Sequence, residues 1–163
     1  MGTSLLRAIL LIGSITAGPA SYAQESRVFG DWEEICTDTK CVLAQETQRP
    51  NSDDVILSST FNVERKTDTV IMRVNVPRQV DLRQGPWLTI DGLFVAQMSY
   101  VNCENSCLSV VLFDRSSIDG LLVGDRGMIT VIGTSGTRLG LPFSLKGLRD
   151  GLIAQLRTDD ERQ

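Results

Sequence analysis

The chain has 163 residues, a formal net charge of -4, and an ordinary globular composition with 42% hydrophobic and 22% charged residues. This length fits one domain that buries its own core, and the acidic balance argues against nucleic acid as a partner, since phosphate binding needs a basic surface. The chain contains no histidine, which excludes Ser/His and Cys/His nucleophilic sites and removes the commonest zinc ligand.

The first 23 residues have the features of a secretory signal peptide. Arg7 supplies the positive charge, residues 8–15 form the apolar segment, and residues 21–23 (Ser-Tyr-Ala) form the cleavage motif. We expect cleavage before Gln24 and a periplasmic product, with outer-membrane association or secretion left open. A membrane anchor is the alternative, but the apolar segment has roughly half of the ~20 residues that span a bilayer. No later segment of the sequence is apolar enough to cross a membrane, so we expect no transmembrane segment after cleavage.

All four cysteines follow this segment: Cys36, Cys41, Cys103 and Cys107. An even number of cysteines in an exported protein predicts two disulfides, and four cysteines allow three pairings. We favour Cys36–Cys41 with Cys103–Cys107, because each pair flanks a short polar segment between strand-like runs and would close the end of a hairpin. A zinc site with four thiolates is the rival interpretation. Its usual C-x2-C spacing is absent, so we expect neither a metal nor a cofactor. A redox enzyme is not expected either, because the chain has no C-x-x-C motif.

Alternating and β-branched segments predict strands along most of the remaining chain, over residues 28–36, 41–48, 55–63, 69–76, 87–90, 93–103, 107–113, 128–133 and 137–143. Residues 55–63 and 69–76 are expected to pair as a hairpin, and the final two strands as another. Asp91-Gly92 is a turn signal between two of these strands. Residues 116–123 fit a short helix or a turn.

The C-terminal part changes to a helical period. Ser144 is the expected N-cap, while Gly147 and Gly151 weaken the helix, so packing must hold it. Residues 158–163 are expected to form a flexible tail. The leucines that define the helix face recur at spacings of three and four: Leu145, Leu148, Leu152 and Leu156.

Several short strands at regular spacing predict an all-β fold, an antiparallel β-sandwich with a short C-terminal helix. We expect a single domain over residues 24–157.

Short motifs in a fixed order connect this sequence to a family. They are Phe29-Gly30-Asp31-Trp32, Val76-Pro77, Ile90-Asp91-Gly92, Tyr100-Val101-Asn102-Cys103, and Pro142-Phe143-Ser144-Leu145-Lys146-Gly147-Leu148. In this order and spacing the chain resembles the invasion-associated locus B family of exported bacterial proteins. The resemblance implies a role at the cell envelope or in host-cell entry, and it brings no catalytic residues.

Three basic residues are candidates for partner binding. Lys146 is expected in the first turn of the predicted helix, where a cation is unfavourable. A partner carboxylate or a binding role would explain it, but a solvent-exposed lysine is the favoured interpretation. Arg78 and Arg83 lie in a loop, residues 78–85, that could insert into a partner. Asp31 beside Trp32 could form a site, but a turn cap next to a core tryptophan is the favoured interpretation.

Three classes of function fit these observations. The favoured one is a non-enzymatic envelope or host-interaction protein that binds an unknown protein partner. The alternative is a periplasmic inhibitor or chaperone-like binding protein that acts on another envelope protein. An enzyme that uses carboxylates alone is the third class, and we expect no catalytic residues.

Overall fold

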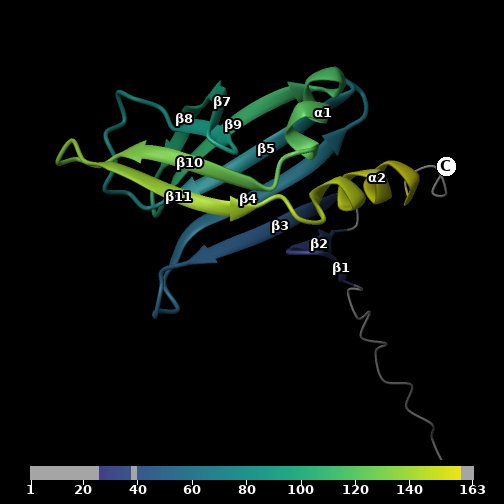
Figure 1. The fold of residues 1–163 in the computed structure, drawn as a ribbon, viewed down its shortest axis with the longest axis horizontal. Coiled ribbons are helices and arrows are strands. Elements are labelled where there is room, and N and C mark those ends of the chain that lie inside the picture. The colour runs from purple at the N-terminus through teal and green to yellow at the C-terminus, as the bar shows by residue number, and fades with distance from the viewer. Residues whose placement is uncertain (1–25, 38–39, 159–163) are drawn as a thin grey trace, which may run out of the picture.

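In the computed structural model, residues 26–37 and 40–158 are described (Figure 1). The predicted signal peptide, its cleavage site and residues 159–163 lie outside these ranges. Within them, no helix has the length and apolar character needed to cross a bilayer.

Two antiparallel sheets are layered in a sandwich-like arrangement, which confirms the predicted fold class (Figure 1). The seven-stranded sheet has the order β1-β2-β3-β4-β5-β9-β8, and the four-stranded sheet has the order β11-β10-β6-β7. The larger sheet contains β1 (Arg27–Phe29), β2 (Trp32–Cys36), β3 (Cys41–Gln48), β4 (Val55–Glu64), β5 (Thr69–Val76), β8 (Ser99–Cys103) and β9 (Cys107–Asp114). The smaller sheet contains β6 (Trp87–Ile90), β7 (Leu93–Gln97), β10 (Arg126–Ile132) and β11 (Arg138–Ser144). The two predicted hairpins are present as β4–β5 and β10–β11.

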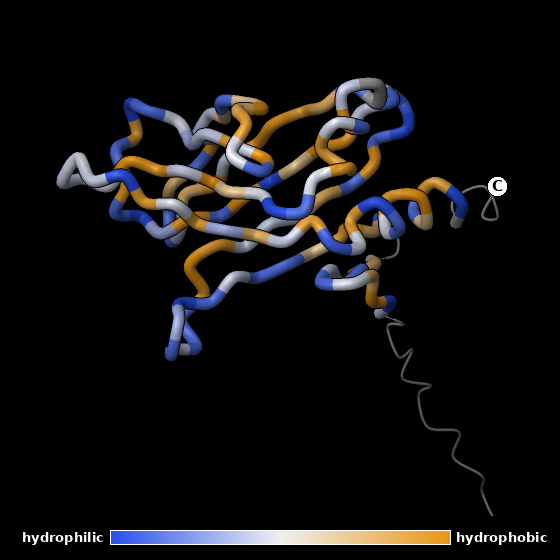
Figure 2. Tube along the Cα trace, viewed as in Figure 1, coloured by the Kyte–Doolittle hydropathy of each residue, from blue (hydrophilic) through white to orange (hydrophobic). Residues whose placement is uncertain are grey.

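The core forms between the sheets because every second residue of a strand points to the same face. In β5 this alternation is strict: Val70, Met72, Val74 and Val76 are buried, and the residues between them are half-buried. Trp32 is fully buried and meets the Phe61 ring edge-on, with the ring centroids 5.3 Å apart. Outside the core the chain is more polar: Figure 2 shows that the turns after β3 and β4 are hydrophilic.

One predicted strand, residues 28–36, is divided in two by a turn. Gly30 has a φ of 58°, a left-handed conformation that favours glycine, and the chain reverses there so that β1 pairs with β2. The N-terminal segment is therefore a short hairpin.

A second predicted strand, residues 93–103, is also wrong as a single element. It changes sheets at Met98: β7 pairs with β6 in the smaller sheet, whereas β8 pairs with β9 in the larger one. The Met98 side chain is buried, and its N–H donates to the Pro86 carbonyl at 2.8 Å. This segment thus connects the two layers of the sandwich.

The prediction that Ser144 caps the C-terminal helix is wrong. Ser144 ends β11, and its hydroxyl accepts a hydrogen bond from the Lys146 N–H at 3.1 Å, which forms a tight turn. The helix α2 (Leu148–Thr158) begins after Gly147, whose φ is 87°. Lys146 therefore precedes the helix, so the argument from the helix dipole does not apply to it. The short helix α1 (Arg115–Leu122) forms where a helix or a turn was predicted.

The N-terminal hairpin and the end of β11 are joined by hydrogen bonds. The Asp31 N–H donates to the Lys146 carbonyl at 3.0 Å, and the Trp32 indole N–H donates to the Ser144 carbonyl at 3.1 Å. The Gln45 amide bridges both segments, because it donates to the Asp31 carbonyl at 2.9 Å and accepts from the Ser144 N–H at 2.8 Å. Asp31 and Trp32 thus have structural roles, and these contacts close one side of the sandwich.

Candidate functional site

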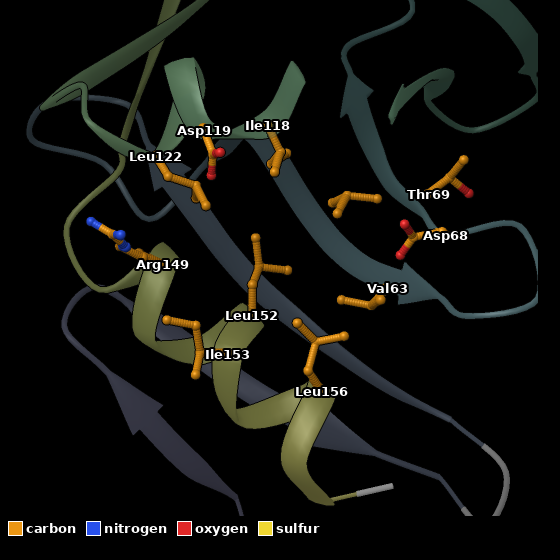
Figure 3. Close-up of a pocket in the computed structure, with 11 residues that line it drawn as sticks. Val63, Asp68, Thr69, Ile118, Asp119, Leu122, Arg149, Leu152, Ile153 and Leu156 are labelled. Carbon is orange, nitrogen blue, oxygen red and sulfur yellow. The ribbon is translucent and has the colours of Figure 1, made fainter. Parts of the chain in front are cut away.

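An apolar groove of about 170 Å³ lies between α1 and α2, over the adjoining ends of β4 and β5 (Figure 3). Such a concave, mostly apolar site with a few charged groups at its margin is the usual form of a binding site. Its lining residues are Val63, Asp68, Thr69, Val70, Ile118, Asp119, Leu122, Arg149, Leu152, Ile153 and Leu156.

The two helices supply facing aliphatic walls. Ile118 and Leu122 are four residues apart in α1, and Leu152 and Leu156 have the same spacing in α2, so each pair lies on one side of its helix. Figure 3 shows the two pairs on either side of the groove. Leu152 is 3% exposed, as its place on the predicted leucine face of the helix requires, whereas Ile153 is 38% exposed at the margin.

The position of α2 is held by hydrogen bonds to the end of β4. The buried Gln155 side-chain oxygen accepts from the Val63 N–H at 3.3 Å. Arg65 donates to the carbonyls of Gln155, at 3.3 Å, and Leu156, which satisfies acceptors that the end of a helix leaves unpaired. Gly151 faces Leu43, and an added Cβ would lie 2.6 Å from that side chain. The groove is therefore preformed by the fold.

Charged side chains of both signs stand at the margin of the groove. Asp68 comes from the β4–β5 turn, Asp119 from α1, and Arg149 from the first turn of α2 (Figure 3). An aliphatic cavity with charges at its margin can hold an apolar side chain beside a charged group.

The predicted basic residues do not lie at this groove. Lys146 has an exposed side chain in the turn before α2, and its carbonyl is the acceptor for Asp31. Arg78 is exposed in the connection between β5 and β6. Arg83, in the same connection, binds Asp81 through two hydrogen bonds, from Nε at 2.9 Å and from Nη2 at 2.8 Å. These bonds, with a third from the Arg83 N–H, lower the pKa of Asp81 to about 2.

The connection that carries these arginines is fastened to the β10–β11 hairpin. The Asp81 N–H donates to the Ile132 carbonyl at 2.7 Å, and the Thr134 N–H donates to the Gln79 carbonyl at 3.2 Å. This region lies at the end of the sandwich opposite α2 (Figure 1). The structure thus places Arg78 and Arg83 far from Lys146, and the three do not form one site.

A polar hollow lies beside the same connection. Its lining residues are Leu82, Arg83, Gly85, Gln97, Met98, Ser99 and Tyr100. The Tyr100 hydroxyl is buried and has no hydrogen-bond partner among the described residues. Burial raises the pKa of Tyr100, and the negative charge of Asp81 raises it further.

The four cysteines lie in two pairs at disulfide distance, each at the end of a hairpin. Cys36 and Cys41 have an S–S length of 2.09 Å, and Cys103 and Cys107 have one of 2.20 Å. Within the described ranges, one group of potential metal-ligand atoms comes together, on Glu34, Cys36 and Cys41. The two sulfurs are bonded to each other, so this group offers no thiolate to a metal.

The sequence profile of the invasion-associated locus B (IalB) proteins matches residues 32–155. The chain belongs to the invasion-associated locus B family. A fold likeness agrees with this membership: the crystal structure of invasion-associated protein B from Bartonella henselae superposes with a TM-score of 0.77 at 15% identity. The match covers 83% of this chain and 99% of the Bartonella chain. No curated protein sequence matches the chain significantly.

The short motifs that connect this chain to the family lie at contacts that hold the fold together rather than at the groove. Asp31, Trp32 and Ser144 belong to the hydrogen bonds that close the sandwich. Sequence reasoning identified Leu152 and Leu156 as one helix face but did not assign a groove to them. The spacing of Ile118 and Leu122 was the available signal for the second wall.

Proposed function

We propose that this member of the invasion-associated locus B family is an exported protein that binds a partner protein through the α1–α2 groove, without catalysis at that site. The observation that carries the proposal is a preformed aliphatic groove held open by the fold. Its walls are apolar and the chain contains no histidine, which favours binding over catalysis.

The groove fits an apolar side chain of the partner next to a basic residue. Its volume of about 170 Å³ is close to the ~150 Å³ of a protein cavity that accepts benzene. Asp119 at the margin favours a neighbouring cation, while Arg149 favours an acidic or carbonyl group. The partner segment is therefore apolar at its centre and charged at its flanks.

The envelope location and the invasion-associated role rest on separate observations. The signal-like N-terminal segment and the two local disulfides support an oxidising compartment outside the cytoplasm. Family membership supports an invasion-associated role.

Site-specific photocrosslinking in intact cells tests the groove. A photoreactive residue at Ile153, on the margin, should give a discrete crosslinked protein. The same probe at Leu139 is the matched control, since this side chain is 46% exposed and lies on β11 outside the groove. Ile153→Lys removes the apolar part of the contact, and Asp119→Lys removes the acidic part. Each should therefore reduce recovery of that partner at least ~10-fold. Leu139→Lys should not.

Equal crosslinking from Ile153 and Leu139 would contradict a specific groove. A partner captured only from a probe at Arg83 would instead favour the alternative function, an inhibitor or chaperone-like protein that acts through the β5–β6 connection.

A further inference from the structure

Glu34 is a buried carboxylate beside the disulfide that closes the β2–β3 hairpin. Its side chain is 1% exposed, and its Oε2 atom accepts a hydrogen bond from Arg27 Nε at 2.6 Å and forms an ion pair with Arg27 Nη2 at 2.5 Å. The other oxygen, Oε1, is buried and has no hydrogen-bond partner among the described residues. A buried, unpaired carboxylate oxygen is costly, so its retention calls for an explanation.

The carboxylate lies beside the sulfurs because of strand geometry. Glu34 and Cys36 are two residues apart in β2 and share a face, and Cys36 is directly opposite Cys41 in β3. One carboxylate oxygen of Glu34 and the two Sγ atoms all lie within 4.8 Å of one another. One bridging water spans such a distance, so Glu34 is within reach of a proton on either sulfur. Both cysteines are half-buried, so this hairpin end is partly exposed to solvent, in contrast to the fully buried Cys107.

We propose that Cys36–Cys41 is a thiol–disulfide exchange site for dithiol or disulfide groups of partner proteins, with Glu34 as its proton acceptor and donor. Starting from the reduced pair, one thiol gives its proton to Glu34, and the resulting thiolate attacks a disulfide of the partner. The partner's S–S bond breaks, its leaving sulfur departs with the electron pair and takes up a proton, and a mixed disulfide forms. Once Glu34 has passed the first proton to the leaving sulfur, the second cysteine gives up its own proton and displaces the partner's other sulfur, which takes up a proton in turn. Cys36 and Cys41 end as a disulfide, and the partner ends as a dithiol.

The same steps in reverse reduce the bridge. A partner dithiol is oxidised to a disulfide, Cys36 and Cys41 regain their two protons, and Glu34 delivers a proton to the departing thiolate.

The second bridge, Cys103–Cys107, provides the internal contrast. Both bridges close hairpin ends, and both have a Cα–Cα distance of 4.0 Å. Within the described part of the chain, no carboxylate lies with the sulfurs of Cys103 and Cys107. Cys107 is also fully buried, so this bridge reports whether the fold is intact.

The test measures the two bridges separately in the purified chain. Protein reduced at Cys36 and Cys41 by a limited amount of dithiothreitol is reoxidised with oxidised glutathione, quenched by alkylation and analysed by mass spectrometry. Glu34→Gln should slow reoxidation of Cys36–Cys41 by about tenfold or more, because it removes the proton acceptor. Glu34→Asp, which keeps the carboxylate, should recover part of the rate. Cys103–Cys107 should stay oxidised in all three proteins.

A carboxylate that acts only through its charge predicts the opposite sign. Removing the negative charge favours the thiolate, so Glu34→Gln would then speed reoxidation. An equal or faster rate in Glu34→Gln, or opening of both bridges together in the unmodified chain, would overturn the proposal. If Glu34→Gln does not fold, which opening of Cys103–Cys107 reveals, the comparison between Glu34→Asp and the unmodified chain decides: the shorter side chain must slow the reaction.

Discussion

Gly147 packs directly against Gly30, and both glycines have a positive φ, 87° and 58°. A Cβ added at Gly147 would overlap the Phe29 carbonyl and the Gly30 nitrogen, and one added at Gly30 would lie 2.5 Å from the Lys146 carbonyl oxygen. The N-terminal hairpin and the turn before α2 can approach this closely because neither position carries a side chain.

This contact makes Gly147→Ala strongly destabilising. We expect a loss of at least about 3 kcal/mol in the free energy of unfolding, from the left-handed conformation and the backbone overlap together. Gly136→Ala is the control, because Gly136 has a φ of 81° but open space around it. It should cost about 1 kcal/mol, from conformation alone. Equal losses in urea denaturation would mean that the hairpin moves to accommodate the methyl group.

Leu152→Ala should destabilise the protein by about 2–5 kcal/mol, because it leaves a cavity under α2. Thermal and urea unfolding measure this loss. Ile153→Ala, one residue along at the groove margin, should change stability by less than about 1 kcal/mol. A neutral Leu152→Ala would show that α2 does not depend on this contact.

Tyr100 should ionise above its ordinary pKa of 10.0, because burial disfavours the phenolate and Asp81 adds a negative charge. The sequence has two tyrosines, Tyr22 and Tyr100, so removal of the signal segment leaves one phenol to follow by ultraviolet absorbance. Because the folded-state pKa is raised, the neutral phenol contributes to the free energy of unfolding. This contribution is complete at pH values below the unfolded-state pKa of the phenol, and it is lost as pH rises through the folded-state pKa. Asp81→Asn should lower the pKa only part of the way, since burial is the larger cause. A pKa at or below 10.0 would contradict the buried hydroxyl.

Non-reducing peptide mapping should recover Cys36–Cys41 and Cys103–Cys107. A peptide that links either cysteine of one hairpin to the other hairpin would refute this arrangement. Because each loop is short, replacing Cys36 and Cys41 together with serine should cost roughly 2 kcal/mol and leave the protein folded.

N-terminal sequencing of protein from the cell envelope should begin at Gln24. The expectation follows from Arg7, the apolar segment and the small residues at positions 21–23. Substituting Ala23 with a bulky residue should block this processing, and envelope protein that retains Met1 would contradict the signal peptide.

The sequence predicted the strands well where alternation was strong, as in β5, and the buried helix face that contains Leu152. It failed where the backbone changes direction inside an apolar run. Nothing in the alternation of residues 93–103 marks Met98 as the point where the chain changes sheets, because side chains continue to alternate across it. At that point the Met98 N–H donates a hydrogen bond to the Pro86 carbonyl. The sequence around these two residues looks like that of an ordinary loop, so it does not reveal this contact.

The groove was less accessible to sequence reasoning than the fold. Its lining comes from β4, β5, α1 and α2, and an aliphatic residue such as Leu122 has the same pattern whether it lines a groove or fills a core. The position of Glu34 beside the disulfide could not be predicted from the sequence either, because only the pairing of β2 with β3 brings its carboxylate to both sulfurs.

The hydrogen bond from Trp32 to Ser144 joins residues 112 positions apart. A chain that crosses a membrane pore with its N-terminus leading delivers Trp32 first and its acceptor almost last. Until Ser144 follows, the Trp32 indole N–H lacks its native acceptor, so this contact cannot form in a partly delivered chain. The contact that closes this side of the sandwich is therefore among the last to become possible when the chain is delivered with its N-terminus leading.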